Sequence, residues 1–198
     1  MGSVHVVLPN DIDDPATPSG GNTYDRRVCR GLAAAGWTVR EHAAPGGWPR
    51  PTPAERAGLA AVLASVPDND LVLIDGLVAS AVPEVLAPHA ARLRLAVLMH
   101  MPLADDAERA ALSTAVTVVT TSEWTRRRLI DLYGLPAARV SVATPGVDPA
   151  PVTAASESGG RPTPLASRGA GARTGAASCC STTRRATSNA GSHRGSMC

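Results

Sequence analysis

Short runs of apolar residues alternate along the chain with longer segments in which apolar residues recur every three or four positions. A short apolar run bounded by charged or turn-forming residues is typical of a buried strand, and the three- and four-residue spacing is typical of a helix with one apolar face. The runs predict strands at Val4–Leu8, Thr38–Glu41, Leu71–Ile74, Leu93–Met99, Val116–Thr120 and Val140–Val142. The spaced segments predict helices at Asn22–Ala35, Pro53–Val66, Pro83–Ala91, Asp105–Ala115 and Glu123–Tyr133.

This regular alternation of strand and helix predicts the fold class. Two parallel strands need a connection of a dozen or more residues, and the helices that make such connections cover the faces of the sheet. The turn residues agree, because Gly36 can close the first helix, Pro53 suits the first turn of the second, and Gly134 can end the last. We therefore expect an α/β fold with a Rossmann-like, doubly wound and mostly parallel sheet.

The composition changes near residue 159, which divides the chain into a predicted domain at 1–150 and a tail at 151–198. Residues 1–157 carry 13 arginines and all 17 acidic residues, whereas 158–198 carry 6 arginines and no acid. From Gly159 on, Leu165 and Met197 are the only large aliphatic side chains, too few to offset the entropy of ordering the segment. The tail is either a disordered basic segment or the product of out-of-frame translation of GC-rich codons, which yield mostly these residue types.

The aromatic content, the cysteines and the lack of long apolar runs indicate what kind of core the protein has and where in the cell it lies. The chain has no Phe and 3% aromatic residues, so its core must be aliphatic. Cys29 is the only cysteine in the first 150 residues, which excludes a disulfide framework and a spaced zinc pair there. No signal-peptide pattern and no run of 18 apolar residues occurs. We expect a cytoplasmic protein with no integral membrane segment, no metal and no cofactor.

A glycine-containing loop lies between the first strand and the first helix. In the stretch Ser19-Gly20-Gly21-Asn22, the glycines would let a ligand approach the backbone, and the helix start favours an anion such as phosphate. The spacing matches neither the dinucleotide fingerprint nor a P-loop. The alternative is a plain loop in which Ser19 or Asn22 only caps the helix.

Two polar residues follow predicted strands at their carboxyl ends, where open α/β sheets bind ligands. His100 follows the fourth strand and is the candidate catalytic residue, with a purely structural histidine as the alternative. Asp75 follows the third strand, where its carboxylate could accept a hydrogen bond from a sugar hydroxyl or could only terminate the strand.

The fifth strand-to-helix turn and the exit from the sixth strand supply the last two motifs. Ser122 can cap the helix, Glu123 meets its dipole, and the arginines that include Arg127 could grip phosphate or form a solvated face. After the sixth strand, the sequence Pro145-Gly146-Val147-Asp148 reads as a turn that leaves the domain. We expect Gly20, His100 and Ser122 to surround one hollow at the carboxyl edge of the sheet.

In this order, the four motifs resemble family 4 of the retaining, GT-B-fold glycosyltransferases, over about residues 4–150. The resemblance implies an N-terminal, acceptor-side domain in which Gly20, Gly21 and Asn22 lie near the donor diphosphate and His100 lies near the transferred sugar. It also implies a nucleotide-sugar donor and a small-molecule, glycan or lipid acceptor. Asp75, Ser122, Glu123 and Arg127 are further candidates for donor-phosphate or acceptor binding, and Pro145, Gly146 and Asp148 lead toward a second domain.

The sequence departs from this family in its C-terminal half. That half supplies most contacts to the nucleotide sugar in the family, including a basic pair and two glutamates, yet the last acidic residue here is Glu157. We therefore expect a truncated or frameshifted transferase with little or no activity. The alternative is a non-catalytic module that binds a ligand or partner. Nucleic-acid binding by the tail is not expected, because its arginines have no interleaved aromatic residues.

Overall fold

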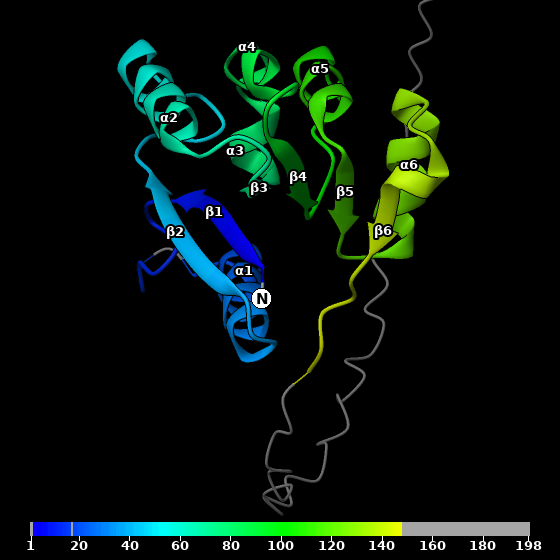
Figure 1. Ribbon diagram of the computed structural model, residues 1–198. Coiled ribbons are helices and arrows are strands. Elements are labelled where there is room, and N and C mark those ends of the chain that lie inside the picture. Colours follow the sequence, from blue (N-terminus) through cyan, green and yellow to red (C-terminus); the bar gives the residue numbers. More distant parts are fainter. Residues whose placement is uncertain (1, 17, 148–198) are drawn as a thin grey trace, which may run out of the picture. The chain divides into compact units, whose positions relative to one another are not determined.

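The computed structural model describes residues 2–16 and 18–147 and confirms the predicted α/β, Rossmann-like fold (Figure 1). Six strands form one sheet in the order β2-β1-β3-β4-β5-β6, and every neighbouring pair is parallel. The strands are β1 (Ser3–Pro9), β2 (Thr38–Ala44), β3 (Leu71–Asp75), β4 (Arg94–Met99), β5 (Thr117–Thr120) and β6 (Val140–Val142).

Within the described residues, six α-helices and two short 3₁₀ helices lie between these strands. The α-helices are α1 (Gly20–Ala34), α2 (Pro53–Ser65), α3 (Gly76–Ser80), α4 (Pro83–Leu86), α5 (Asp106–Thr114) and α6 (Glu123–Tyr133). The 3₁₀ helices are η1 (Ala87–His89) and η2 (Ala137–Arg139).

The region between β3 and β4 differs from the sequence prediction of one helix at Pro83–Ala91. Helix α4 ends at Leu86, and η1 continues the chain through Pro88, whose ring nitrogen cannot donate an α-helical hydrogen bond. Helix α3 was not predicted. It is five residues long, and its start depends on the Asp75 carboxylate, which accepts hydrogen bonds from the backbone N–H groups of Leu77 and Val78.

The strand order reverses beside β1, and this reversal places the helices on different faces of the sheet. The chain moves from β1 to β2 at one edge, then crosses to β3 and adds β4, β5 and β6 toward the other edge. Right-handed crossovers in opposite directions place their helices on opposite faces. Figure 1 shows the result, with α1 on one side of the sheet and α2, α3, α4 and α5 on the other.

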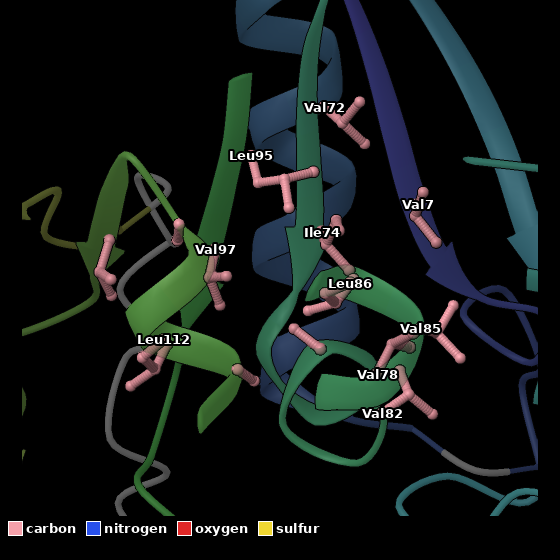
Figure 2. Packing of buried hydrophobic residues seen from close by; sticks show 14 of the residues in the cluster. Val7, Val72, Ile74, Val78, Val82, Val85, Leu86, Leu95, Val97 and Leu112 are labelled. Carbon is pink, nitrogen blue, oxygen red and sulfur yellow. The ribbon is translucent and has the colours of Figure 1, made fainter. Parts of the chain in front are cut away.

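The larger part of the core fills the space between the sheet and the helices that follow β2 (Figure 2). Alternate residues of the central strands, including Val72, Ile74 and Val97, point to this face and are fully buried. Helices α2, α3, α4, α5 and α6 contribute to the same cluster, for example through Leu63, Leu86, Leu112 and Leu129. Ala, Val and Leu supply most of this packing, as the sequence without Phe predicts.

The other face of the sheet packs against α1 through a smaller cluster. Val4, Val6, Leu73 and Leu98 from the strands contact Cys29 and its neighbours on α1 in this cluster. The pKa of the Cys29 thiol is raised to about 11, mainly by burial. This cysteine is therefore a packing residue in its thiol form rather than a nucleophile.

Gly76 lies where α3 passes close to β4, and we expect Gly76→Ala to destabilise the fold by about 1–2 kcal/mol. A Cβ at this position would lie 2.9 Å from the Leu98 carbonyl oxygen and 3.0 Å from the Met99 sulfur. Gly58→Ala in α2 is the matched control, because a Cβ there meets no atom within 4 Å and should stabilise the helix by up to about 1 kcal/mol. Urea denaturation of both variants tests this, and equal midpoints would contradict the steric argument.

None of the helices that the structure describes is long and apolar enough to cross a membrane. The predicted tail and Asp148 lie outside the described residues.

Candidate functional site

A pocket of about 270 Å³ lies at the carboxyl edge of the sheet, beside the point where the strand order reverses. Ligands of open α/β sheets bind in this position, because the loops that follow the strands diverge there. Residues from the end of β1, the start of α1, the β3–α3 junction and the loop after β4 line it. They are Pro9, Ser19, Gly21, Asn22, Asp75, Gly76, Leu77, Met99, His100, Met101 and Leu103.

His100 is the central polar residue of this pocket. It directly follows β4, and its side chain keeps 26% of its surface accessible. Its Nε2 lies 2.8 Å from the Oδ1 of Asp25 and 3.8 Å from the Oδ2 of Asp75. Its Nδ1 has no hydrogen-bond partner among the described residues, and it is not a buried atom. One edge of the ring is therefore anchored, and the other is available to a ligand.

The two carboxyl groups favour the protonated form of His100. Burial disfavours the charged ring, but the hydrogen bond to Asp25, its charge and the charge of Asp75 outweigh burial and raise the pKa of His100. Burial and the nearby charge of Asp25 raise the pKa of Asp75 to about 7. Asp75 and His100 therefore keep their protons to a higher pH than an isolated carboxyl group and an isolated imidazole do.

Asp25 was not among the site residues predicted from the sequence. An acidic residue on the apolar face of the first helix could have indicated it. It is 2% exposed, and it lies one helical turn before Cys29 on the face of α1 that packs against the sheet. An acidic residue on the apolar stripe of a helix is rarely buried without a partner. That partner is His100, which is 75 positions away in the sequence.

Asp75 makes two kinds of contact at the end of β3. Its Oδ1 accepts the hydrogen bonds that start α3, and its Oδ2 faces His100. It is 5% exposed, so only a small part of the carboxyl group reaches the pocket. Its main contribution is to fix α3 and the imidazole relative to each other.

The glycine-containing loop forms the first turn of α1, two residues earlier than predicted. Ser19 is the N-cap, because its Oγ accepts hydrogen bonds from the N–H groups of Gly21 and Asn22. A Cβ on Gly21 would lie 3.5 Å from the Cδ2 of His100, so this residue brings the backbone against the imidazole. Gly21, Asn22 and His100 therefore share one pocket.

Gly20 faces a neighbouring pocket of about 350 Å³. Pro145 and Gly146, from the segment after β6, line that second pocket with it. Tyr24 connects the two regions. Its ring packs edge-on against His100 at a centroid distance of 5.5 Å, and its hydroxyl donates to the Ala143 carbonyl oxygen at 2.6 Å. The exit segment is thus tied to the helix that positions Asp25.

Ser122 lines neither of these two pockets. It caps α6 by accepting a hydrogen bond from the Thr125 N–H, and its Oγ lies 2.9 Å from the Thr125 hydroxyl. The hydroxyls of Thr125 and Thr121 both donate to the His100 carbonyl oxygen. The turn therefore holds the backbone of His100 in place, and Ser122 does not line the His100 pocket.

Glu123 and Arg127 lie on the exposed first turns of α6. The Glu123 carboxylate is 3.1 Å from Arg126 and 3.7 Å from Arg127, and the Arg127 side chain is 70% exposed. Arg127 and Glu123 thus form an ion pair at the surface of α6.

The loop after His100 is held by a buried carboxylate. Glu108 is fully buried in α5 and accepts hydrogen bonds from the N–H groups of Leu103 and Ala104 and from the hydroxyls of Ser80 and Tyr133. Ala104 has a φ of 64°, a left-handed conformation that costs an alanine about 1–2 kcal/mol. Glu108 therefore fixes a strained loop whose residues Met101 and Leu103 line the pocket.

The ligand atoms of Asp25, Asp75 and His100 lie within 4.8 Å of one another, a spacing that a small cation could also bridge. Within this group, His100 and Asp25 share the 2.8 Å hydrogen bond, and Asp75 lies 3.8 Å from His100.

Comparison with known protein families gives a match for the part of the chain that begins near the end of β4. Residues 98–151 match the Glycosyltransferase Family 4 model. The matched segment contains His100, the Ser122 turn and the exit segment, and it leaves out the glycine-containing loop, Asp25 and Asp75. A search of curated proteins found no match to the chain. The family match supports a glycosyltransferase-like function in general terms.

Proposed function

We propose that the described lobe is the acceptor-side half of a retaining, GT-B-type glycosyltransferase that acts on a nucleotide-sugar donor. In this proposal, His100 donates a hydrogen bond from Nδ1 to the transferred sugar, and the start of α1, with Gly21 and Asn22, lies near the donor diphosphate. The observation that carries the proposal is the anchored His100 ring in the pocket at the carboxyl edge of the sheet. The family match over residues 98–151 supports it.

The arrangement suits sugar binding better than proton transfer or covalent catalysis. The Nε2 edge of His100 is held by a buried carboxylate, so the ring is a fixed donor with one free position. Fixed donors of this kind are effective in transferase sites because they need no reorganisation when charge develops on the substrate. The apolar residues Leu77, Met99 and Leu103 line the rest of the pocket and would pack against a sugar ring.

We also propose that the 198-residue chain turns over a donor slowly or not at all. A retaining transfer must stabilise a cationic sugar centre and a departing nucleoside diphosphate together, which requires charged groups on both sides of a closed cleft. The residues described here supply one side. Beyond Glu157 the sequence has arginines but no carboxylate that could complete the other.

A binding and a turnover measurement test the two parts separately. Ligand-observed NMR on the purified chain, with uridine- and guanosine-diphosphate sugars, should detect weak binding in which the sugar protons contact the protein. A coupled assay for nucleoside diphosphate release should give no donor-dependent signal. Turnover by the purified chain would contradict the inactivity, and a lack of contact with any sugar would contradict the sugar-binding role.

Removing the imidazole should weaken sugar binding selectively. His100→Ala is expected to weaken binding of the nucleotide sugar about tenfold, because a hydrogen bond from a charged donor contributes about 1.5–3 kcal/mol. Binding of the free nucleoside diphosphate should change much less. Met101→Ala is the matched control, because Met101 lines the same pocket and is 69% exposed. Equal weakening of both ligands by His100→Ala would argue that the histidine has only a structural role.

A further inference from the structure

A second pocket of about 270 Å³ adjoins the His100 pocket, between the loop after β1, the start of α1 and the loop from β2 to α2. Both pockets are lined by Pro9, Ser19, Asn22 and Leu77. The residues that line the second pocket but not the first are Asp11, Gly46, Gly47 and Trp48. We call it the Trp48 pocket. A ligand in it would lie beside a ligand at His100.

The Trp48 side chain forms a fixed apolar wall of this pocket. Its ring is half-buried and packs against the larger core cluster, and its Nε1–H donates to the Ala44 carbonyl oxygen at 2.9 Å. Because this N–H is already used, the indole offers a ligand a flat apolar surface rather than a hydrogen bond. Such a surface packs well against the C–H face of a sugar-like ring.

The loop that carries Trp48 is held by the first turn of α2. Gly46 has a φ of 140°, and a Cβ at this position would lie 2.8 Å from the Cδ of Glu55. Glu55 in turn accepts a hydrogen bond from the Thr52 N–H and completes the cap of α2. Contacts within the lobe therefore fix the position of the wall.

Two polar side chains of the Trp48 pocket have no partner within the part of the chain that the structure describes. Neither the Asp11 carboxylate nor the Asn22 side-chain amide forms a hydrogen bond or an ion pair there. A carboxylate accepts hydrogen bonds, and an amide both donates and accepts them. Neighbouring hydroxyl groups on one ring would satisfy both side chains.

The charge of the pocket disfavours an anionic ligand. Among the described residues that line it, Asp11 is the only charged one. Its carboxylate would repel a phosphate group, and no lining arginine would offset that repulsion. A purely apolar ligand would cover the half-buried Asn22 amide without pairing it. The lining therefore favours an uncharged ring that carries several hydroxyl groups.

We propose that the Trp48 pocket binds the acceptor, and that this acceptor is an electrically neutral polyol ring, either a sugar or a cyclitol. The ring packs against Trp48, and Asp11 and Asn22 hold its hydroxyl groups. One further hydroxyl then lies next to the sugar that His100 contacts. This inference rests on the proposed function, because it takes the His100 pocket as the place of the transferred sugar.

Ligand-observed NMR titrations of the full 198-residue chain test the class of acceptor. The neutral probes are myo-inositol and glucose, and the charged probes are the monophosphates of both. The neutral probes should show saturable binding. Each phosphate should bind about three- to tenfold more weakly than its neutral counterpart, because its charge meets Asp11. Asp11→Asn keeps an acceptor oxygen without the charge, so it should reduce this difference to less than about twofold.

Replacing the aromatic ring tests the wall of the pocket. Trp48→Leu keeps an apolar side chain against the core but removes the flat ring, and it should weaken binding of the neutral probes about five- to tenfold. Trp124→Leu is the matched control, a 61% exposed tryptophan of α6 that lines neither pocket. Asn22→Ala removes no core packing and should weaken binding about three- to fivefold. Thermal melts followed by circular dichroism check that each variant is folded.

The proposal is overturned if neither neutral probe binds, if the phosphates bind as tightly as the neutral probes, or if Trp48→Leu and Trp124→Leu have equal effects. If Trp48→Leu does not fold, unchanged binding by Asn22→Ala overturns it instead. Parallel titrations with the nucleotide sugars separate this proposal from the proposed function. Nucleotide-sugar binding without polyol binding would contradict only the acceptor pocket. Polyol binding without nucleotide-sugar binding would support that pocket and contradict the proposed role of His100.

Discussion

Glu108→Ala is expected to lower the free energy of unfolding by about 3–5 kcal/mol, the largest effect of any substitution considered for this chain. The carboxylate is fully buried, and its removal leaves the hydroxyls of Ser80 and Tyr133 and two backbone N–H groups without an acceptor. Each buried donor that loses its partner costs about 1–3 kcal/mol. Guanidinium denaturation followed by circular dichroism measures the loss.

Two controls separate the loss of hydrogen bonds from a general effect of removing a charge. Glu108→Gln keeps one acceptor oxygen and should cost about 1–2 kcal/mol. Glu84→Ala removes a glutamate of α4 whose side chain is 56% exposed and paired with Arg56, and it should cost less than about 1 kcal/mol. If Glu108→Ala were as mild as Glu84→Ala, Glu108 would not be the anchor of the loop that lines the pocket.

The second large effect is a pH dependence of stability that originates at Asp75. Its pKa of about 7 in the folded chain lies above the ordinary value of 3.8, because the group is buried and faces Asp25. The folded state therefore binds a proton more tightly than the unfolded state. This stabilisation is fully present below the unfolded pKa and is lost as the pH rises through the folded pKa. Between pH 5 and pH 8, it should decrease by about 2–3 kcal/mol.

The difference between the wild type and Asp75→Asn isolates this contribution. The raised pKa of His100 acts in the same direction, whereas the lowered pKa values of His42 and His89 act in the opposite one. Asparagine keeps an oxygen that can cap α3 but cannot ionise. Urea denaturation of both proteins from pH 5 to pH 8 should therefore show curves that diverge, with the variant losing less stability. Parallel curves would show that Asp75 does not titrate in this range.

The fold could be predicted from the sequence because its signal is local. Each predicted strand overlaps an observed one, since a short apolar run between charged residues has few other ways to be buried. The exceptions depend on single side chains. Helix α3 starts because one carboxylate caps it, and α4 stops just before Pro88. Neither effect changes the spacing of apolar residues.

The site was harder to predict because its contacts are not local. His100 and Asp75 could be placed at the carboxyl edge, since both follow strands that the sequence identifies. The partner of His100 is Asp25, which follows no strand and reaches the histidine only because β3 alone separates β1 from β4 in the sheet. Ser122 was placed at the correct turn, but the direction in which that turn faces depends on packing between α6 and the His100 backbone.

The strand order also determines when, during synthesis, the molecule can assemble. From β4 onward, every new strand pairs with the strand made just before it, so the sheet can grow at one edge as the chain leaves the ribosome. The carboxylates of Asp25 and Asp75 emerge first, and the imidazole that balances them follows with β4. A nascent chain that stops short of His100 would bury two acids beside each other, whereas one that extends past β4 to His100 contains all three groups of the site.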